Sequence, residues 1–341
     1  MRKVLLPVLI LLLTACTQAA SPTHAAPTEK PTPNQESADA TQEFELGTYS
    51  PQQIEIELAD PEPFDIQMPS VQYFDGIGSL YLDQGIYYAL VGGFDQDTDY
   101  YYVYQAVSQN GLEWVFNESD LTAHDLFEGG SCVPRQLLRP NAQEWIYYAQ
   151  CNDGTQIGDP AYIIYLTAPA FTGPWSWNPE PIVGGNSAED TPVWLLNLTP
   201  IPTGYRMYVY FPVSARIGVA QSEDGYSWEF LTQGSEGPDN VFTVQDGDGQ
   251  LIPVRRVEAV WQEGERWYMI YLAPAPTDGS MEAYTPSYSL ASGPDGLHWM
   301  SIGEVTLPFE EMGGTGIITS VIPKDDLLVA TLCRWADEGG M

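Results

Sequence analysis

The stretch Tyr205–Trp228, YRMYVYFPVSARIGVAQSEDGYSW, predicts two strands followed by a turn and the start of a third strand. Its first part, Tyr205–Phe211, is rich in aromatic and β-branched residues, which favour strands, and Arg216–Gln221 continues the pattern. The polar segment Ser222–Gly225 then predicts a turn, because glycine adopts a positive φ at little cost. One such unit would indicate only a β-meander.

Repetition of this unit points to the fold class. The same spacing from Gly to Trp recurs along the chain after an Asn or Asp, once in a looser form, and an aromatic strand precedes each turn. Strand-only repeats at a period of tens of residues are typical of propeller blades, with an ordinary β-sandwich as the alternative. The turns are Gly111–Trp114, Gly225–Trp228, Gly296–Trp299 and the looser Thr172–Trp177, and the strands before them are Ile86–Val91, Tyr205–Phe211, Trp267–Leu272 and Trp145–Cys151.

The sequence therefore predicts an all-β protein with a five-bladed β-propeller over residues 44–341. The last blade begins at Gly316 and shows only two obvious strands before Met341. Either strands within Phe44–Leu58 complete it, because a ring must cover its open edges, or the C-terminus is truncated. The other four blades span Gly76–Phe116, Cys132–Trp177, Thr191–Leu231 and Val254–Ile302.

The amino-acid composition agrees with this fold and argues against nucleic acid as a partner. The 341 residues include 10 Trp, 21 Tyr, 31 Gly and 28 Pro, which favour strands and turns over helices. The 12 Lys and Arg against 46 Asp and Glu give a formal net charge of −34. Such a surface repels phosphate backbones, so nucleic acid is not an expected partner.

The N-terminus predicts export. Residues 1–15 have a charged start and a short apolar run, as a signal peptide has, and Leu13–Cys16 resembles the lipobox of bacterial lipoproteins. This resemblance implies lipidation of Cys16 and a lipid anchor in the cell envelope, with a cleaved signal and an incidental cysteine as the alternative. Residues 16–43 are rich in Ala, Thr and Pro and predict a flexible tether. We expect a monomer that contacts the membrane only through its lipid.

Two cysteines flank one predicted hairpin. Cys132 and Cys151 lie at equal distances from the midpoint between Asn141 and Ala142, so simple register makes them cross-strand neighbours. A disulfide between them is expected in an exported protein, with two buried thiols as the alternative. Cys333 is left over and is expected to be buried.

Chemistry is expected where the inner strands of the blades begin, because these positions converge at one mouth of a propeller. Several acidic residues would meet there beside guanidinium groups, and two carboxyl groups across a cleft are the groups that glycoside hydrolysis uses. Each also has a plainer interpretation as part of a turn, a solvated loop or an ion pair. Two Trp residues near these positions would stack on a sugar ring or pack between blades. The residues are Asp75, Arg135, Glu189, Asp190, Arg255, Arg256 and Glu258, with Trp194 and Trp261.

The repeated units RIGVAQSEDGYSW and YSLASGPDGLHW resemble those of the five-bladed propeller glycosidases, the clan of glycoside hydrolase families 43 and 32. The resemblance covers about residues 76–335 and implies a domain that acts on carbohydrate. Family 43 uses an Asp base, a helper Asp and a Glu acid on its first three blades. Asp75 loosely matches the base, but Arg135 stands at the helper position, and Ala188–Pro192 resembles the third motif with one extra residue.

These matches imply Glu189 or Glu258 as the acid and Asp75 or Asp190 as the base, with Arg135 and Arg256 holding the substrate. A sugar- or ligand-binding propeller without catalysis is the alternative, which Arg135 favours. A sialidase ranks third, because Ser222–Trp228 is one residue shorter than the sialidase Asp-box. A purely structural envelope protein is a further alternative.

Metal sites are only faintly indicated. Asp95–Asp99 begins like an EF-hand loop, but Tyr100 replaces the required Gly and Ala106 the bidentate Glu. Asp246–Gly249 is an acidic turn. Either could hold calcium, with a simple turn as the alternative, and neither zinc nor another cofactor is expected.

Overall fold

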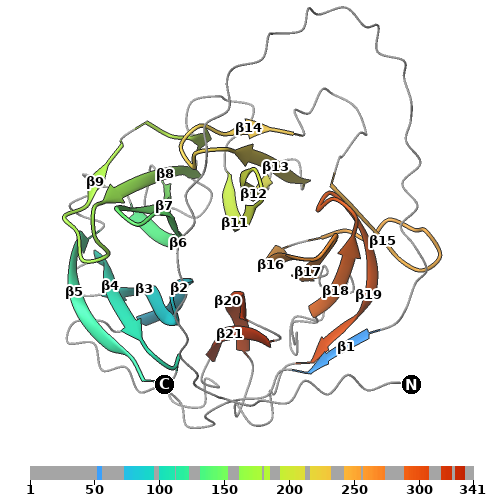
Figure 1. The fold of residues 1–341 in the computed structure, drawn as a ribbon, viewed down its shortest axis with the longest axis horizontal. Coiled ribbons are helices and arrows are strands. Elements are labelled where there is room, and N and C mark those ends of the chain that lie inside the picture. Colours follow the sequence, from blue (N-terminus) through green and yellow to red (C-terminus); the bar gives the residue numbers. More distant parts are fainter. Residues whose placement is uncertain are drawn as a thin grey trace, which may run out of the picture.

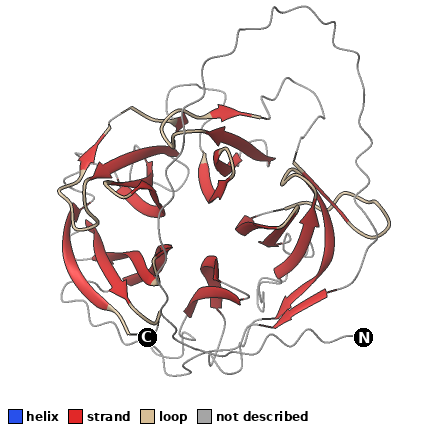
Figure 2. Ribbon diagram, in the orientation of Figure 1, coloured by secondary structure: helices blue, strands red, loops and turns tan. Residues whose placement is uncertain are grey.

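The structure is a computed structural model. It describes residues 52–55, 73–95, 100–111, 113–122, 131–152, 161–178, 180–184, 193–211, 216–231, 242–254, 256–272, 288–306, 316–324 and 327–334. These residues form strands, turns and loops without a helix, as Figure 2 shows, so none of them provides an apolar helix that could span a membrane. Five sheets stand in a ring (Figure 1), and the prediction of an all-β propeller is confirmed.

Four of the sheets are complete blades with four or more strands. Blade 1 consists of β2 (Tyr73–Asp83), β3 (Ile86–Asp95), β4 (Tyr100–Ser108) and β5 (Val115–Thr122). Blade 2 consists of β6 (Ser131–Asn141), β7 (Glu144–Asn152) and β8 (Ala161–Ala168), with β9 (Ser176–Trp177) and β10 (Val183–Gly184) both paired to β8. Blade 3 consists of β11 (Trp194–Ile201), β12 (Gly204–Phe211), β13 (Arg216–Ser222) and β14 (Glu229–Phe230).

Blade 4 has two additional strands on its outer edge. Its main strands are β16 (Arg256–Glu263), β17 (Arg266–Leu272), β18 (Tyr288–Gly293) and β19 (His298–Thr306). Both β1 (Gln52–Glu55) and β15 (Thr243–Gln245) pair in parallel with β19. The fifth sheet contains only β20 (Gly316–Lys324) and β21 (Leu327–Arg334).

Two details of the prediction are therefore wrong. The described residues form four complete blades instead of five, with a two-stranded sheet in the fifth place of the ring. The N-terminal strand that was expected to complete the last blade joins blade 4 instead. An outer strand such as β19 offers unpaired backbone N–H and C=O groups, and these accept any extended segment that reaches them.

Hydrophobic packing at every junction holds the ring together. Separate clusters of buried side chains lie between successive blades, and each draws residues from both neighbours. The fifth sheet packs on blade 4 through Ile318 and Val321 and on blade 1 through Ile322 and Val329. The inner strands β2, β6, β11, β16 and β20 each contact the next, and β20 contacts β2, so the ring closes. We call this ring of inner strands the hub.

The repeated Gly-to-Trp turns lie between the third and fourth strands of blades 1, 3 and 4. In blade 3 the Asp224 carboxylate accepts hydrogen bonds from the backbone N–H groups of Tyr226 and Ser227 at 2.7 and 2.9 Å. The Trp228 indole donates to the Gly225 carbonyl at 3.2 Å, and Gly225 has a φ of 83°. Asp295 accepts the equivalent backbone hydrogen bonds in blade 4, whereas the indole bond recurs only at Trp114 in blade 1, since the indole nitrogen of Trp299 has no partner among the described residues.

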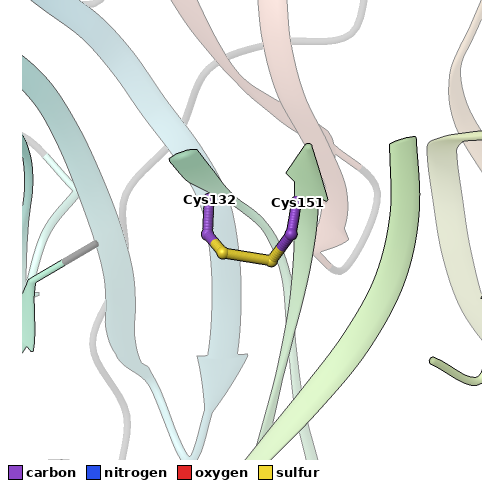
Figure 3. The surroundings of a disulfide bond; sticks show 2 residues. All are labelled: Cys132 and Cys151. Atoms are coloured by element: carbon purple, nitrogen blue, oxygen red, sulfur yellow. A yellow bond between two sulfur atoms is a disulfide. The ribbon is translucent and has the colours of Figure 1, made fainter. Parts of the chain in front are cut away.

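A disulfide joins Cys132 on β6 to Cys151 on β7, as Figure 3 shows. The two residues are direct cross-strand partners, and both are buried. Because Cys132 is the second residue of β6, the bond fixes the beginning of an inner strand to its neighbour. The backbone of Cys333 lies in β21, and its side chain falls outside the described part of the structure.

Candidate active site

Every inner strand of the ring contains a β-bulge, where one residue has no partner on the neighbouring strand. A bulge bends the strand and redirects the side chain of the extra residue. The pairing omits Asp75 and Gly78 in β2, Arg135 in β6, Leu196 in β11, Glu258 in β16 and Thr319 in β20, and β6 has a second irregularity at Arg139 and Pro140, near its hairpin turn. Three of the residues that the sequence singled out, Asp75, Arg135 and Glu258, thus occupy bulges on the hub.

Glu258 is the most deeply buried carboxyl group among the described residues. Only 3% of its side chain is exposed, and its Oε1 atom lies 3.1 Å from Nε of Arg256, whose side chain is 36% exposed. This oxygen accepts no hydrogen bond from the described residues. The contact is therefore an ion pair between a partly exposed arginine side chain and a buried carboxyl group.

Burial dominates the acidity of Glu258. Loss of water around the carboxyl raises its pKa from 4.5 to about 7, although the positive charges of Arg256 and Arg135 act in the opposite direction. A carboxyl group with such a pKa is partly protonated at neutral pH and can donate a proton. The side chain thus has the property that a general acid needs.

Arg135 reaches Glu258 electrostatically from a blade that is not its neighbour. Arg135 belongs to β6 of blade 2, Glu258 belongs to β16 of blade 4, and β11 lies between these strands in the ring. The charge of Arg135 also opposes the rise that burial causes in the pKa of Tyr147. The field of this guanidinium therefore acts at the hub, where the inner strands converge.

Asn197 is a site residue that the sequence analysis missed. It follows the bulge of β11, it is buried, and its side-chain amide donates to the backbone carbonyl of Glu258 at 3.4 Å. Its Oδ1 atom and the hydroxyl of Ser79 on β2 are buried without a hydrogen-bond partner among the described residues. The signal was an amide within the apolar segment Trp194–Leu198, because a buried polar group there needs a reason.

The two candidate aromatic residues have different surroundings. Trp194 begins β11, is 45% exposed and contacts Tyr210 with ring centroids 5.7 Å apart. Trp261 stacks on its cross-strand partner Tyr268 at 5.5 Å and packs against the cluster between blade 4 and the fifth sheet. Packing thus occupies Trp261, whereas Trp194 keeps a large accessible surface.

The remaining candidates are only partly described. Asp75 has a described backbone in β2, but its side chain is not described. The backbone of Asp95 is described in β3, whereas the rest of that acidic loop, through Asp99, lies outside the described residues. The other candidates outside the described residues are Cys16, Glu189, Asp190 and Arg255.

The acidic turn at Asp246 uses its carboxylate within the backbone. Oδ1 of Asp246 accepts hydrogen bonds from the N–H groups of Asp248 and Gln250 at 2.9 and 2.8 Å. Across the described ranges, no group of three or more His, Cys, Asp or Glu residues gathers in a way that could hold a metal ion. The structure thus favours the turn interpretation for Asp246–Gly249.

Solved structures with a similar arrangement include glycoside hydrolases. One of them, a glycoside hydrolase, is 14% identical over 77% of this chain and 88% of its own, with a TM-score of 0.53. The GH43_1 enzyme from Xanthomonas citri, complexed with xylose, is 11% identical over 76% and 80%, also at 0.53. A glycosyl hydrolase from Bacteroides ovatus is 12% identical over 77% and 84%, at 0.51.

The chain shares their fold. No protein family model matches the sequence, and no curated protein is significantly similar to it. At such low identity the likeness establishes the propeller and says nothing of individual catalytic residues.

Proposed function

We propose that the chain is a carbohydrate-active, glycosidase-like domain in which Glu258 is the general acid. The observation that carries this proposal is the burial of Glu258 at a bulge of the hub, with a pKa near neutrality. Glycoside hydrolysis requires an acid that protonates the leaving oxygen and a second carboxylate that acts as base or nucleophile. The fold shared with glycoside hydrolases supports the same class of substrate.

Asp75 is the proposed second carboxylate. It occupies a bulge on β2, an inner strand like the one that carries Glu258, so its backbone belongs to the same ring. Glu189 remains the alternative acid, and Asp190 the alternative base. We further propose that the domain is exported and held at the cell envelope through a lipid on Cys16, followed by the tether of residues 16–43.

A sugar-binding propeller without catalysis is the second candidate. Two observations favour it: Arg256 pairs with the carboxyl of Glu258, and Arg135 stands where family 43 has a helper Asp. A carboxylate that stays paired with a guanidinium is ionised and has no proton to donate, so it would serve in binding alone. Turnover measurements separate this candidate from the first.

The decisive experiment is a screen of the exported chain against aryl glycosides and plant and microbial glycans, with the Glu258→Gln variant beside it. Loss of a general acid is expected to lower turnover by about 10²- to 10⁴-fold. The rate should also fall as pH rises through about 7, because the acid must be protonated. Glu263→Gln, which alters an exposed residue of the same strand, is the matched control.

Turnover that Glu258→Gln leaves intact would refute the assignment of the acid. Sugar binding without turnover, in the wild type and in Glu258→Gln alike, would instead establish the second candidate.

A further inference from the structure

Two arginines act on a buried carboxyl group at the hub of a strongly acidic protein. Arg256 and Arg135 both act on a single carboxyl group, that of Glu258, although the whole chain has a formal net charge of −34. The raised pKa of Glu258 means that this carboxyl neutralises less than one full charge at neutral pH. A guanidinium that this carboxyl does not fully neutralise attracts a ligand with the opposite charge.

Arg256 has the geometry to bind such a ligand. It uses Nε toward Glu258, and within the described part of the chain its two terminal nitrogens take part in no ion pair. A guanidinium presents a second edge at these nitrogens, which matches the two oxygens of a carboxylate. Water reaches the Arg256 side chain, which is 36% exposed, whereas Glu258 is almost fully covered.

The neutral side chain of Asn197, next to the backbone of Glu258, indicates a hydroxyl group on the same ligand. Oδ1 of Asn197 is buried without a hydrogen-bond partner among the described residues, and the amide nitrogen of this side chain donates to the backbone of Glu258. A buried acceptor without a donor costs stability unless a bound molecule supplies the donor. A sugar hydroxyl is such a donor.

We infer that the hub binds a sugar that carries a carboxylate, such as a uronic acid, with Arg256 holding the carboxylate and Asn197 accepting from a hydroxyl. This inference rests on the proposed function, because it names the substrate class of the same site. It also assigns a specificity-determining role to Arg256, apart from any role of Glu258 in catalysis.

The test is a binding titration of the wild-type chain with two matched pairs of sugars, glucuronic acid against glucose and galacturonic acid against galactose. The members of each pair differ only in a carboxylate at carbon 6. We expect each acid to bind about 10-fold or more tightly than its neutral partner, with a preference that salt weakens. Arg256→Gln should abolish this preference, whereas Arg266→Gln, on the exposed end of β17, should keep it.

Equal binding of acid and neutral sugars, an acid preference that survives Arg256→Gln, or no binding of any of the four would overturn the inference. If Arg256→Gln does not fold, Arg256→Lys keeps the charge without the paired edge, and the inference then requires a weakened preference. Binding is measured without turnover, so a uronate preference in a chain that hydrolyses nothing would support the inference and refute only the proposed enzyme. Hydrolysis confined to neutral sugars would do the reverse.

Discussion

Glu258 is a residue in which burial and ion pairing act against each other. Arg256 lies 3.1 Å away, and an exposed pair at that distance would keep the carboxyl charged. Almost no water reaches Glu258, however, and the cost of a charge without water exceeds the attraction of the two guanidiniums. The folded chain therefore binds a proton more tightly at this site than the unfolded chain does.

This difference makes stability depend on pH. Since the pKa rises from 4.5 to about 7 on folding, the contribution of Glu258 is greatest below pH 4.5 and is lost as pH rises through about 7. The total loss is about 3 kcal/mol. Denaturant titrations of the wild type and Glu258→Gln should show the variant gaining in relative stability over this pH range.

The Glu263→Gln variant, which changes an exposed carboxyl on the same strand, serves as the reference. A difference between wild type and Glu258→Gln that stays constant from pH 4 to pH 8 would contradict the prediction.

At the scale of the element, the Gly-to-Trp turns join neighbouring blades. The turn at Gly225 belongs to blade 3, yet its carbonyl accepts a hydrogen bond from the hydroxyl of Tyr148, which is buried in blade 2. The equivalent bond joins Tyr208 of blade 3 to the carbonyl of Gly296 in blade 4, at 3.0 Å. One repeated turn thus shapes its own blade and holds the preceding one.

Gly225 is expected to be a costly position for any side chain. Its φ is 83°, and a Cβ atom there would lie 3.2 Å from side-chain atoms of Ile146, Leu138 and Tyr148. Gly225→Ala should lower the free energy of unfolding by about 2–4 kcal/mol, through backbone strain and overpacking. Chemical denaturation measures this loss.

Gly85 separates these two causes. It has a φ of 82°, but nothing lies within 4 Å of a Cβ placed there. Gly85→Ala should therefore cost only the backbone strain, about 1–2 kcal/mol. Equal losses for the two variants would show that packing against blade 2 contributes nothing.

The sequence predicts the blades well because they are local. Each hairpin and turn is encoded within tens of residues, as Tyr205–Trp228 shows, and repetition of that unit identifies the propeller. The partner of β1 is not local, since an isolated strand joins whichever edge the folded ring offers, and its assignment failed for that reason.

The sequence pointed to some residues of the candidate site but not to its geometry. Asp75, Arg135 and Glu258 stood out as charged residues near strand starts, and all three lie at bulges. A bulge depends on how two strands pair, so no pattern within one strand reveals it. Asn197 carried a signal in the sequence as an amide within an apolar segment, but its partner, the backbone of a residue 61 positions away, is revealed only by the structure.

At the scale of the whole molecule, the ring has to close although its negative charges repel one another. The fifth sheet closes the ring by contacting blades 4 and 1, and the backbone N–H of Ile318 donates to the hydroxyl of Tyr288 in blade 4 at 3.1 Å. A formal charge of −34 opposes any compact state, because the like charges are held near one another. Hydrophobic packing at the junctions has to exceed this repulsion.

Salt should therefore stabilise the protein. Raising NaCl from about 10 mM to about 0.5 M shortens the screening length from about 30 Å to a few ångströms, so the melting temperature at pH 7 should rise by several degrees. The same change near pH 4.1, the isoelectric point of the sequence, should have little effect. An equal rise at both pH values would point to a general salting-out effect instead of screened repulsion.

The bulges separate the side chains that could bind or react at the hub from the strand pairing that holds each blade together. Arg135, Leu196 and Glu258 stand outside the register that pairs their strands, so exchanging one of these side chains leaves the ladder of backbone hydrogen bonds on either side in place. Evolution or protein engineering could therefore change the chemistry of the hub one inner strand at a time, without altering the pairing of the strands within the blades.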